Sequence, residues 1–279
     1  MANKTKLVPI PSTNMVPERD FGKRPILECV GLGITFGGLK AVEDFNIAIG
    51  RTEIAGLIGP NGAGKTTVFN LLTKVYQPTH GTILLDGRDT HGMDTAHVNR
   101  AGIARTFQNI RLFPSLTVEE NVAVGMDTQM KYNMASGILR LKNYWKEEKL
   151  VHDRCLELLS LFHMEGLANV KAGSLPYGAQ RRLEIVRALA TGPSLRLLDE
   201  PAAGMNPSET AELMENIRKI RDTFQIAILL IEHDMNLVMN ICEGIAVLNF
   251  GRIIAKGTPD DIQANPAVIE AYLGKKKEA

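Results

Sequence analysis

Gly59-Pro60-Asn61-Gly62-Ala63-Gly64-Lys65-Thr66 is the stretch that decides the fold of this chain. It fits the pattern G-x-x-x-x-G-K-[ST], whose glycines let the backbone curve until successive N–H groups point at phosphate oxygens. The apolar run Glu53–Ile58 leads into the stretch, and a predicted helix over Gly64–Thr73 adds its positive N-terminal end. We therefore expect a nucleotide-phosphate site, in which Lys65 neutralises the β- and γ-phosphates and the Thr66 hydroxyl binds Mg²⁺.

Working outward from this loop, strand-like and helix-like segments alternate along the chain, with Gly37-Gly38 predicting a hairpin between the first two strands. The predicted strands are Ile26–Phe36, Ala41–Ile49, Glu53–Ile58, Thr82–Leu85, Ile103–Phe107, Leu195–Leu198, Ile226–Ile231, Ile245–Asn249 and Arg252–Ala255. The predicted helices are Gly64–Thr73, Lys142–Phe162, Tyr177–Ala190, Pro207–Thr223 and Asp234–Met239. This alternation is typical of an α/β protein with a mostly parallel sheet covered by helices.

The pattern changes in the middle of the chain, because strand signals vanish from about Thr117 to Gly173. A helical insertion between two halves of one α/β core explains this change. The predicted organisation is a flexible N-terminal arm (1–24), a single domain (25–274) and a basic tail (275–279). Within the domain we expect a core of about 25–108 and 177–257, a helical subdomain of about 109–176, and a C-terminal helical segment of about 258–274.

Composition narrows the class of protein. Lys and Arg number 32 against 31 Asp and Glu, which argues against a broad electrostatic grip on nucleic acid, so we expect no nucleic-acid partner. Three scattered cysteines, Cys29, Cys155 and Cys242, form no metal-like cluster, and we expect buried or idle thiols in a reducing compartment.

No apolar run approaches the roughly 18–20 residues that span a bilayer. The longest strong run, Ile226–Ile231, has the length of a strand, and no apolar region follows the N-terminal lysines as it would in a signal peptide. We expect a cytosolic protein, or one held at a membrane by a partner.

A second cluster of candidate residues follows the strand Leu195–Leu198. The strand delivers Asp199 at its carboxyl end, where α/β sheets place ligands, and Asp199 would hold Mg²⁺ directly or through water. Glu200 follows at once and would polarise a water for attack on the γ-phosphate. An apolar strand followed by Asp-Glu is by itself better explained as a capped turn, and the phosphate loop upstream makes it a candidate site. Arg196 is unusual in a central strand, and we expect it to lie near the strand's start and to reach outward.

Two further side chains follow strands in the same way. His233, after Ile226–Ile231, would contact the γ-phosphate and orient Glu200 and the water, although a lone histidine is more often structural. Gln108, after Ile103–Phe107, would reach the metal or the water, although taken alone it is an ordinary surface glutamine.

The order of these pieces resembles the ATP-binding subunit of an ABC transporter, over about Ile26–Gly274. The resemblance implies a P-loop NTPase (RecA-like) core with an antiparallel β subdomain and an inserted α-helical subdomain, which binds ATP and Mg²⁺ and hydrolyses ATP. It matches the glycine loop, extended by one residue to Gly59–Thr67, to the Walker A loop, and Leu198–Pro201 to Walker B. Three further motifs of the family also have counterparts, namely the Q-loop at Gln108, the switch histidine at His233 and the D-loop at Ala203–Asn206. It also places Phe36 where an aromatic stacks on adenine, and spacing alone fits a core strand residue equally well.

Leu175–Gln180 occupies the position of the signature motif, normally Leu-Ser-Gly-Gly-Gln. In the family this helix start caps the γ-phosphate of ATP bound to a second subunit, so the resemblance assigns Tyr177, Gly178, Ala179 and Gln180 to a trans contact. Pro176 removes the usual serine hydroxyl and a backbone N–H, and Ala179 replaces a glutamine. These departures bear on the strength of capping, while the backbone amides of the helix start keep an anion site.

Finer features resemble one subgroup, the ATP-binding subunits of importers for branched-chain amino acids and related small solutes. They are Tyr177 with the following Arg-Arg-Leu-Glu-Ile, Arg105–Gln108, Glu200–Gly204, and Asn265-Pro266 with Ala271–Gly274. The resemblance implies a peripheral protein at the cytoplasmic face of the cell (inner) membrane. Its implied partners are permease subunits, a second ATP-binding subunit in a homodimer or heterodimer, and indirectly a solute-binding protein.

Four alternatives stay open at this point. A urea or short-amide importer ATPase belongs to the same subgroup. A soluble ABC ATPase without a transporter usually carries two cassettes or a long coiled-coil insertion, and this chain has one cassette and a short insertion. Tyr177 and the C-terminal Ala-Tyr-Leu-Gly argue against a lipopolysaccharide exporter. A degenerate subunit that binds ATP and hardly hydrolyses it would explain Pro176 and Ala179.

Overall fold

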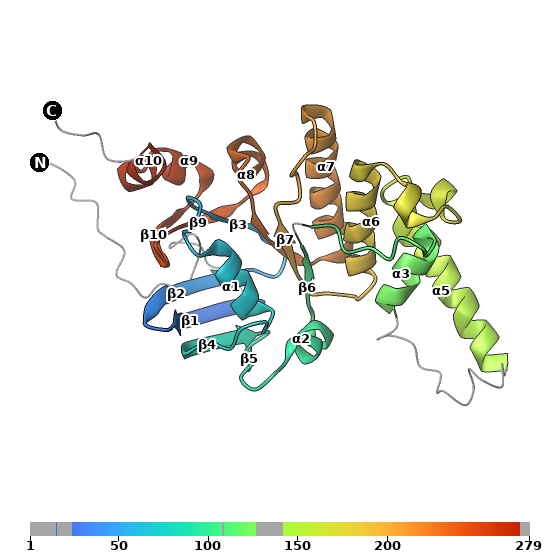
Figure 1. Ribbon diagram of the computed structural model, residues 1–279, viewed down its shortest axis with the longest axis horizontal. Coiled ribbons are helices and arrows are strands. Elements are labelled where there is room, and N and C mark those ends of the chain that lie inside the picture. The colour runs from blue at the N-terminus through green and yellow to red at the C-terminus, as the bar shows by residue number, and fades with distance from the viewer. Residues whose placement is uncertain (1–14, 16–23, 108, 127–141, 274–279) are drawn as a thin grey trace, which may run out of the picture.

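A computed structural model of the chain describes residues 15, 24–107, 109–126 and 142–273, which form two sheets with helices around them (Figure 1). The smaller sheet is antiparallel, with the strand order β2-β1-β4-β5. Its strands are β1 (Leu27–Phe36), β2 (Leu39–Ile49), β4 (His80–Leu85) and β5 (Arg88–Asp89). The predicted hairpin is confirmed, because β1 and β2 pair up to Phe36–Leu39 around Gly37 and Gly38, whose positive φ angles of 49° and 93° favour glycine.

The larger sheet has the strand order β10-β9-β3-β8-β7-β6. Its strands are β3 (Ile54–Ile58), β6 (Ile103–Thr106), β7 (Leu195–Asp199), β8 (Ala227–Ile231), β9 (Gly244–Asn249) and β10 (Arg252–Gly257). All neighbours pair in parallel except β10, which returns antiparallel to β9. Every residue of β3, β7 and β8 is buried, as expected of parallel strands covered on both faces.

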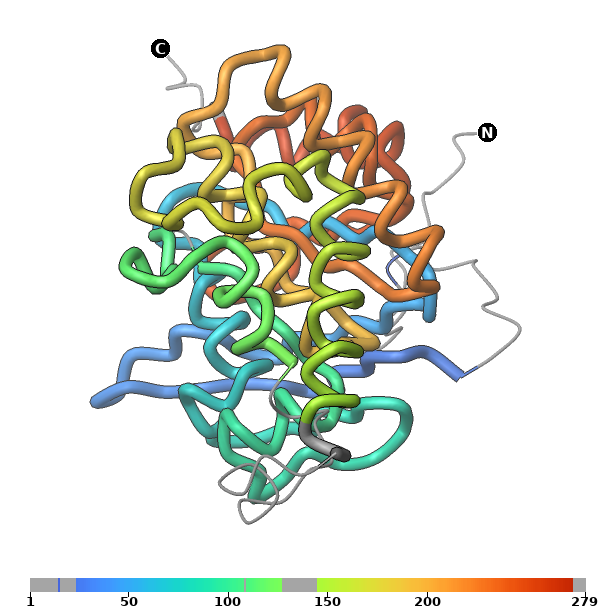
Figure 2. Tube along the Cα trace, turned by 90° about the vertical axis from the view of Figure 1, so that its right-hand side faces the viewer, coloured from blue at the N-terminus to red at the C-terminus, as the bar shows by residue number. Residues whose placement is uncertain are grey.

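Two hydrophobic clusters cover the two faces of the larger sheet. One cluster joins alternate residues of its strands to the smaller sheet and to α1 (Lys65–Leu72), and the short α2 (Thr95–Ala101) adds Val98 to it. The other cluster joins the remaining strand residues to seven helices. These helices are α3 (Val118–Met126), α5 (Lys142–Ser160), α6 (Tyr177–Leu189), α7 (Pro207–Phe224), α8 (Met235–Ile241), α9 (Pro259–Gln263) and α10 (Pro266–Leu273). Figure 2 looks at the helical side of the molecule, where α5 runs along the front.

The predicted helical insertion has the expected character within the described residues. Between 109 and 176 they contain α3, α5 and the 3-10 turns Glu165–Leu167 and Ala172–Ser174, and their one β contact is an isolated bridge between Thr117 and Lys171. In the predicted N-terminal arm the structure describes Met15, whose side chain is fully buried. None of the described helices is both long and apolar enough to cross a membrane.

The prediction for Arg196 is wrong. It is the second residue of β7, as expected, but its side chain is 1% exposed and does not reach outward. Side chains alternate along a strand, so Arg196 points to the same face as Leu198, where the strands pack against the seven helices of the second hydrophobic cluster. The three cysteines are free and buried, as predicted.

Candidate nucleotide site

The glycine loop connects β3 to α1 and depends on three glycines. Gly59, Gly62 and Gly64 have φ angles of 151°, 78° and 105°, in the region that side chains other than glycine's rarely adopt. A Cβ on Gly59 would lie 2.0 Å from the Leu248 carbonyl oxygen, and one on Gly64 would lie 2.8 Å from that of Ala41. The backbone of the loop therefore packs directly against the Leu248 and Ala41 carbonyls, and only glycine fits at positions 59 and 64.

Helix α1 begins directly after Gly64 and exposes an uncapped N-terminus. No side chain caps its first amides, and its first turn holds no acidic residue. A helix start of this kind presents free N–H groups and a positive dipole end, which suits a phosphate. Thr66 is exposed in this first turn, while Pro60 and Thr67 are half-buried, Asn61 is exposed and Ala63 is buried beneath the loop.

Lys65 folds back over the loop that precedes it. Its Nζ donates to the carbonyl oxygens of Gly59, at 2.6 Å, and Pro60, at 3.1 Å. Burial lowers the pKa of Lys65, and the negative charges of Glu200 and Asp199 partly offset this effect. The ammonium thus lies in the field of both carboxylates that end β7, which brings the two predicted halves of the site together.

At the end of β7, Asp199 forms a buried ion pair that the sequence interpretation missed. Its Oδ2 accepts from Arg105 Nη2 at 2.6 Å, and the two side chains are only 7% and 5% exposed. Arg105 also donates to Asn70 Oδ1 at 2.7 Å, and its guanidinium lies over the ring of Phe107 at 4.8 Å. A charged residue in a predicted buried strand favours an opposite charge nearby, but nothing in the local sequence indicates which residue supplies it.

Glu200 and His233 meet as the sequence predicted. His233 Nε2 lies 3.1 Å from Glu200 Oε1, although the two residues come from turns after different strands. The backbone of Glu200 has φ 48°, in the left-handed region, where a residue other than glycine stores about 1–3 kcal/mol of strain. Its N–H donates to Ile231 O at 2.9 Å, so the strained turn is fixed to the end of β8.

Glu232 organises the turn that carries His233, a role the sequence did not reveal. Its side chain is buried, with one oxygen accepting from the Ala202 N–H at 2.7 Å and the other from the His233 N–H at 2.9 Å. Burial raises the pKa of Glu232, and these backbone N–H groups partly offset the effect. Glu232 therefore connects the turn after β7 with the turn after β8.

Phe36 lies at the end of β1 and is 42% exposed. Its ring meets that of Tyr76 edge to face, with centroids 5.2 Å apart and planes at 73°. The alternative of a core strand residue is therefore wrong, because the ring is on the surface. Tyr76, which the sequence interpretation passed over, completes an exposed aromatic pair.

The signature stretch forms the start of α6, which begins at Tyr177. Pro176 precedes it without any side-chain cap, and the first turn holds no acidic residue, so the first amides of α6 are uncapped. Tyr177 is exposed, Ala179 is buried, and Gln180 turns back to donate to the Leu175 carbonyl at 2.8 Å. Gly178 is half-buried and lies close to the start of α7, since a Cβ there would be 3.1 Å from Glu209 Oε1.

The chain does not bring its signature stretch to its own glycine loop. The buried residues of α1 belong to the cluster on one face of the larger sheet, and those of α6 belong to the cluster on the other face. Figure 1 agrees, with α1 and α6 on opposite sides of β7. The loop, Lys65, Asp199, Glu200 and His233 therefore form one group, and Tyr177–Gln180 a separate one.

The oxygen donors near the loop have the chemistry that Mg²⁺ prefers. Asp199 supplies a carboxylate and Thr66 an exposed hydroxyl, while the third predicted ligand, Gln108, lies outside the described residues. Within the described part of the chain, no group of three or more His, Cys, Asp or Glu side chains could hold a metal. A magnesium ion here would need phosphate oxygens to complete its coordination, as expected for a metal that arrives with a nucleotide.

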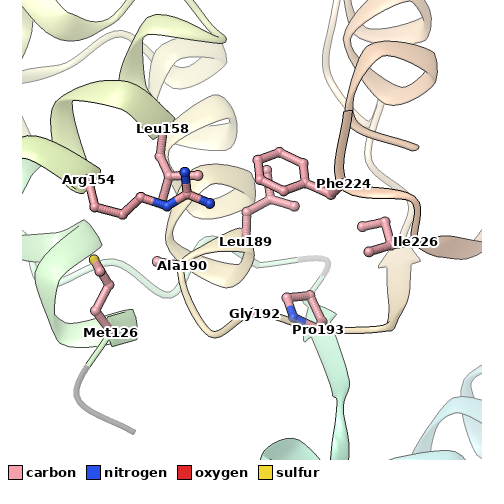
Figure 3. A pocket seen from close by; sticks show the side chains of 9 residues that line it. All are labelled: Met126, Arg154, Leu158, Leu189, Ala190, Gly192, Pro193, Phe224 and Ile226. Carbon is pink, nitrogen blue, oxygen red and sulfur yellow. The ribbon is translucent and has the colours of Figure 1, made fainter. Parts of the chain in front are cut away.

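A separate pocket of about 190 Å³ opens at the other end of the strands (Figure 3). Pro193 and Ile226, which precede β7 and β8, line it together with Leu158 and Phe224. The Arg154 guanidinium lies 5.8 Å above the Phe224 ring. Because ligands of α/β sheets bind at the carboxyl ends of the strands, this pocket is not part of the nucleotide site.

Comparison with known proteins defines the class to which this fold and site belong. The family described as ABC transporter matches residues 42–203. The crystal structure of the ADP conformation of MJ1267, an ATP-binding cassette of an ABC transporter, superposes with a TM-score of 0.78 and 29% identity, covering 91% of this chain and all of MJ1267. The chain belongs to the ABC transporter family and is an ATP-binding protein with ATPase activity coupled to transport.

Two further matches indicate the particular type, and a third is to a dimeric cassette. Residues 252–278 match the family described as Branched-chain amino acid ATP-binding cassette transporter. The high-affinity branched-chain amino acid transport ATP-binding protein BraF of Pseudomonas aeruginosa is 46% identical over 252 residues, which cover 90% of this chain and 99% of BraF. The dimeric structure of MJ0796, a bacterial ABC transporter cassette, is similar at a TM-score of 0.71 and 25% identity, covering 84% of this chain and 98% of MJ0796. This chain is of the branched-chain amino acid transport type.

Proposed function

We propose that this protein hydrolyses ATP to drive the uptake of branched-chain amino acids through separate permease subunits. The observation that carries the proposal is the convergence of Lys65, Asp199, Glu200 and His233 beside an uncapped phosphate loop. The substrate class rests on the similarity to BraF and on the match at the C-terminus. A nucleotide-binding subunit has no contact with the solute, so the substrate is inferred through the relatives.

In this proposal the loop amides and Lys65 hold the ATP phosphates, and Phe36 stacks on the adenine. Mg²⁺, held by Thr66, Gln108 and Asp199, would neutralise charge on the β- and γ-phosphates. Glu200 accepts a proton from a water molecule whose oxygen forms the new bond to the γ-phosphorus, while the bond to the β–γ bridging oxygen breaks. His233 orients Glu200, which the 3.1 Å contact between them supports.

A second ATP-binding subunit completes each site. The separation of Tyr177–Gln180 from the glycine loop of the same chain supports this, because the signature amides can then reach only the ATP of another subunit. The similarity to the dimeric MJ0796 cassette is consistent with a dimer of ATP-binding subunits. Either an identical or a different ATP-binding subunit fits the geometry.

The proposed location is the cytoplasmic face of the cell membrane, where permeases would hold the protein. The helical subdomain of about 109–176 would pass the motion of the dimer to them. Residues 1–24 and 275–279 would form an arm and a tail beside the domain 25–274, and Met15 of the arm belongs to the core cluster that contains Leu27 and Leu57. A solute-binding protein on the other side of the membrane would take part indirectly.

Affinity purification of the protein from detergent-solubilised membranes tests this proposal. We expect permease subunits of an amino-acid importer to co-purify, and cells that lack the protein to lose most of their high-affinity leucine uptake. Reintroducing the wild-type chain should restore uptake, and a Lys65→Ala chain, expressed at the same level, should not. Normal leucine uptake with loss of urea or amide uptake would overturn the substrate class, and recovery in the soluble fraction without permeases would overturn the transport role.

A further inference from the structure

A buried ion pair on α6 connects the signature helix to two backbone segments of the hydrolysis site. The Arg181 and Glu184 side chains are each only 2% exposed, and Arg181 Nη1 lies 3.0 Å from Glu184 Oε2. Such a pair contributes little to stability, because the desolvation of both charges offsets their attraction. Its contacts with other segments therefore point to a role other than stability.

Arg181 binds two carbonyl oxygens outside its own helix. Its Nη1 donates to Phe107 O at 2.5 Å, directly after β6, and its Nη2 lies 3.3 Å from Glu200 O, directly after β7. Glu184 adds a third hydrogen bond to backbone outside α6, since its Oε1 accepts from the Arg111 N–H at 3.3 Å. One guanidinium thus spans the ends of two neighbouring strands and holds both against α6.

The contact to Glu200 is made where the backbone is strained. Glu200 has φ 48°, and a residue other than glycine keeps such a conformation only when its surroundings fix it. Its N–H is held by Ile231 O, and its carbonyl accepts from Arg181 and from the Ala203 N–H at 3.2 Å. The direction of the Glu200 carboxylate therefore depends partly on where Arg181 holds the peptide.

We propose that Arg181 is a positioning residue for ATP hydrolysis, which sets the backbone of Glu200 according to the position of α6. The inference rests on the proposed function, in which α6 begins with the amides that contact ATP on a second subunit. A shift of α6 on closure of the dimer carries Arg181 with it, one turn after Tyr177. Arg181 then passes that shift to the turns after β6 and β7. The Glu200 carboxylate therefore reaches its hydrolytic position only after the second subunit has bound.

The double variant Arg181→Leu/Glu184→Leu tests this by removing both charges of the pair together. Because Glu184 also partly offsets the burial of the Arg196 guanidinium, the same pair of changes is made in an Arg196→Leu background as well. Because hydrophobic pairs often replace buried ion pairs without loss of stability, we expect a folded protein. Misplacement of a catalytic group by about 1 Å lowers a rate on the order of a hundredfold, so we expect kcat to fall by roughly ten- to a hundredfold. The KM for ATP should change less than about threefold, because helix α1, which follows the phosphate loop, packs on the face of the sheet opposite α6.

Two single variants complete the experiment. Arg181→Lys keeps the charge but replaces the rigid two-nitrogen fork that holds Phe107 O and Glu200 O with a single ammonium, so its kcat should also fall. Arg182→Ala on the same helix removes only an exposed pair with Glu212 and should keep the wild-type kcat and KM. Wild-type kcat in Arg181→Lys, or in a folded double variant, would overturn the proposal. Glu200→Gln, measured alongside, separates the two ideas, because wild-type hydrolysis in that variant would refute the assignment of Glu200 as the base.

Discussion

Arg105 and Arg196 are both buried arginines of the central sheet, one on β6 and one on β7, yet their surroundings differ completely. Arg105 meets the Asp199 carboxylate at 2.6 Å and donates to Asn70 as well. All three guanidinium nitrogens of Arg196 lack a hydrogen-bond partner in the described structure. Burial lowers the pKa of Arg196 to about 9, with the charge of Glu184 partly offsetting it.

The difference shows what a buried charge does at the two ends of a strand. At the carboxyl ends the charges pair with one another around the site that would hold ATP. Near the amino end of β7, the Arg196 guanidinium has no hydrogen-bond partner in the described structure, and burying a charge without one costs free energy. Because the pKa of Arg196 is lower in the folded protein than in the unfolded chain, this free-energy cost applies in full well below about pH 9 and declines as the pH rises through that value.

Glu200→Gln tests the charged residues at the carboxyl ends of the strands and should have the largest effect on the ATPase rate. Removing the general base should lower kcat by roughly 10²–10⁴-fold, while ATP binding is retained and an ATP-dependent dimer accumulates. Steady-state ATPase assays and size-exclusion chromatography with ATP measure both outcomes. The surface variant Glu212→Gln serves as control and should behave as wild type, and an unchanged rate in Glu200→Gln would exclude this residue as the base.

Arg105→Met tests whether the paired arginine stabilises the protein. It leaves the buried Asp199 carboxylate without its counter-ion, so we expect a loss of about 3–5 kcal/mol in the free energy of unfolding. Denaturant unfolding followed by circular dichroism measures this. Lys40→Met, which breaks a surface pair with Glu43, should lose at most about 1 kcal/mol. Equal losses in the two variants would contradict a special role for the buried pair.

Arg196→Leu should have the opposite sign. Replacing an unpartnered buried charge with an apolar side chain should raise the free energy of unfolding by about 1–4 kcal/mol, without changing kcat. Arg196→Lys keeps the charge in the same place and should bring no gain. Destabilisation by Arg196→Leu in the same denaturant experiment would mean that Arg196 has a partner after all.

The start of α6 allows a test with a smaller expected effect, because its first backbone amides lack a side-chain partner whereas those of α7 have one. Helix α7 begins with a capping box between Asn206 and Glu209, whereas α6 begins after Pro176 without a side-chain cap. Pro176→Ser should stabilise the protein by about 0.5–2 kcal/mol through a new cap and should raise ATPase activity if the hydroxyl reaches the partner's ATP. Asn206→Ala should lose a similar amount of stability. An unchanged melting temperature and rate would show that this site does not use a serine.

Local sequence was sufficient for most elements because their signals are short-range. The glycine pattern of Gly59–Thr66, the apolar run of β8 and the turn around Gly37-Gly38 each predicted an element that the structure contains. The prediction also brought Glu200 and His233 together, because both follow parallel strands whose carboxyl ends meet at one edge of a sheet. By contrast, Arg105 and Asp199 are 94 positions apart in the sequence, and no local signal specifies that they pair.

By itself, then, the sequence determined the phosphate loop, the alternation of strands and helices, and the family. Only the tertiary structure decided that Arg196 is buried, that Phe36 is exposed beside Tyr76, and that α6 covers the face of the sheet opposite α1. The physical reason is that periodicity and glycine conformation act over a few residues, whereas burial and charge pairing depend on which distant segments meet. Packing alone therefore decided that Tyr177–Gln180 lies away from the glycine loop of its own chain.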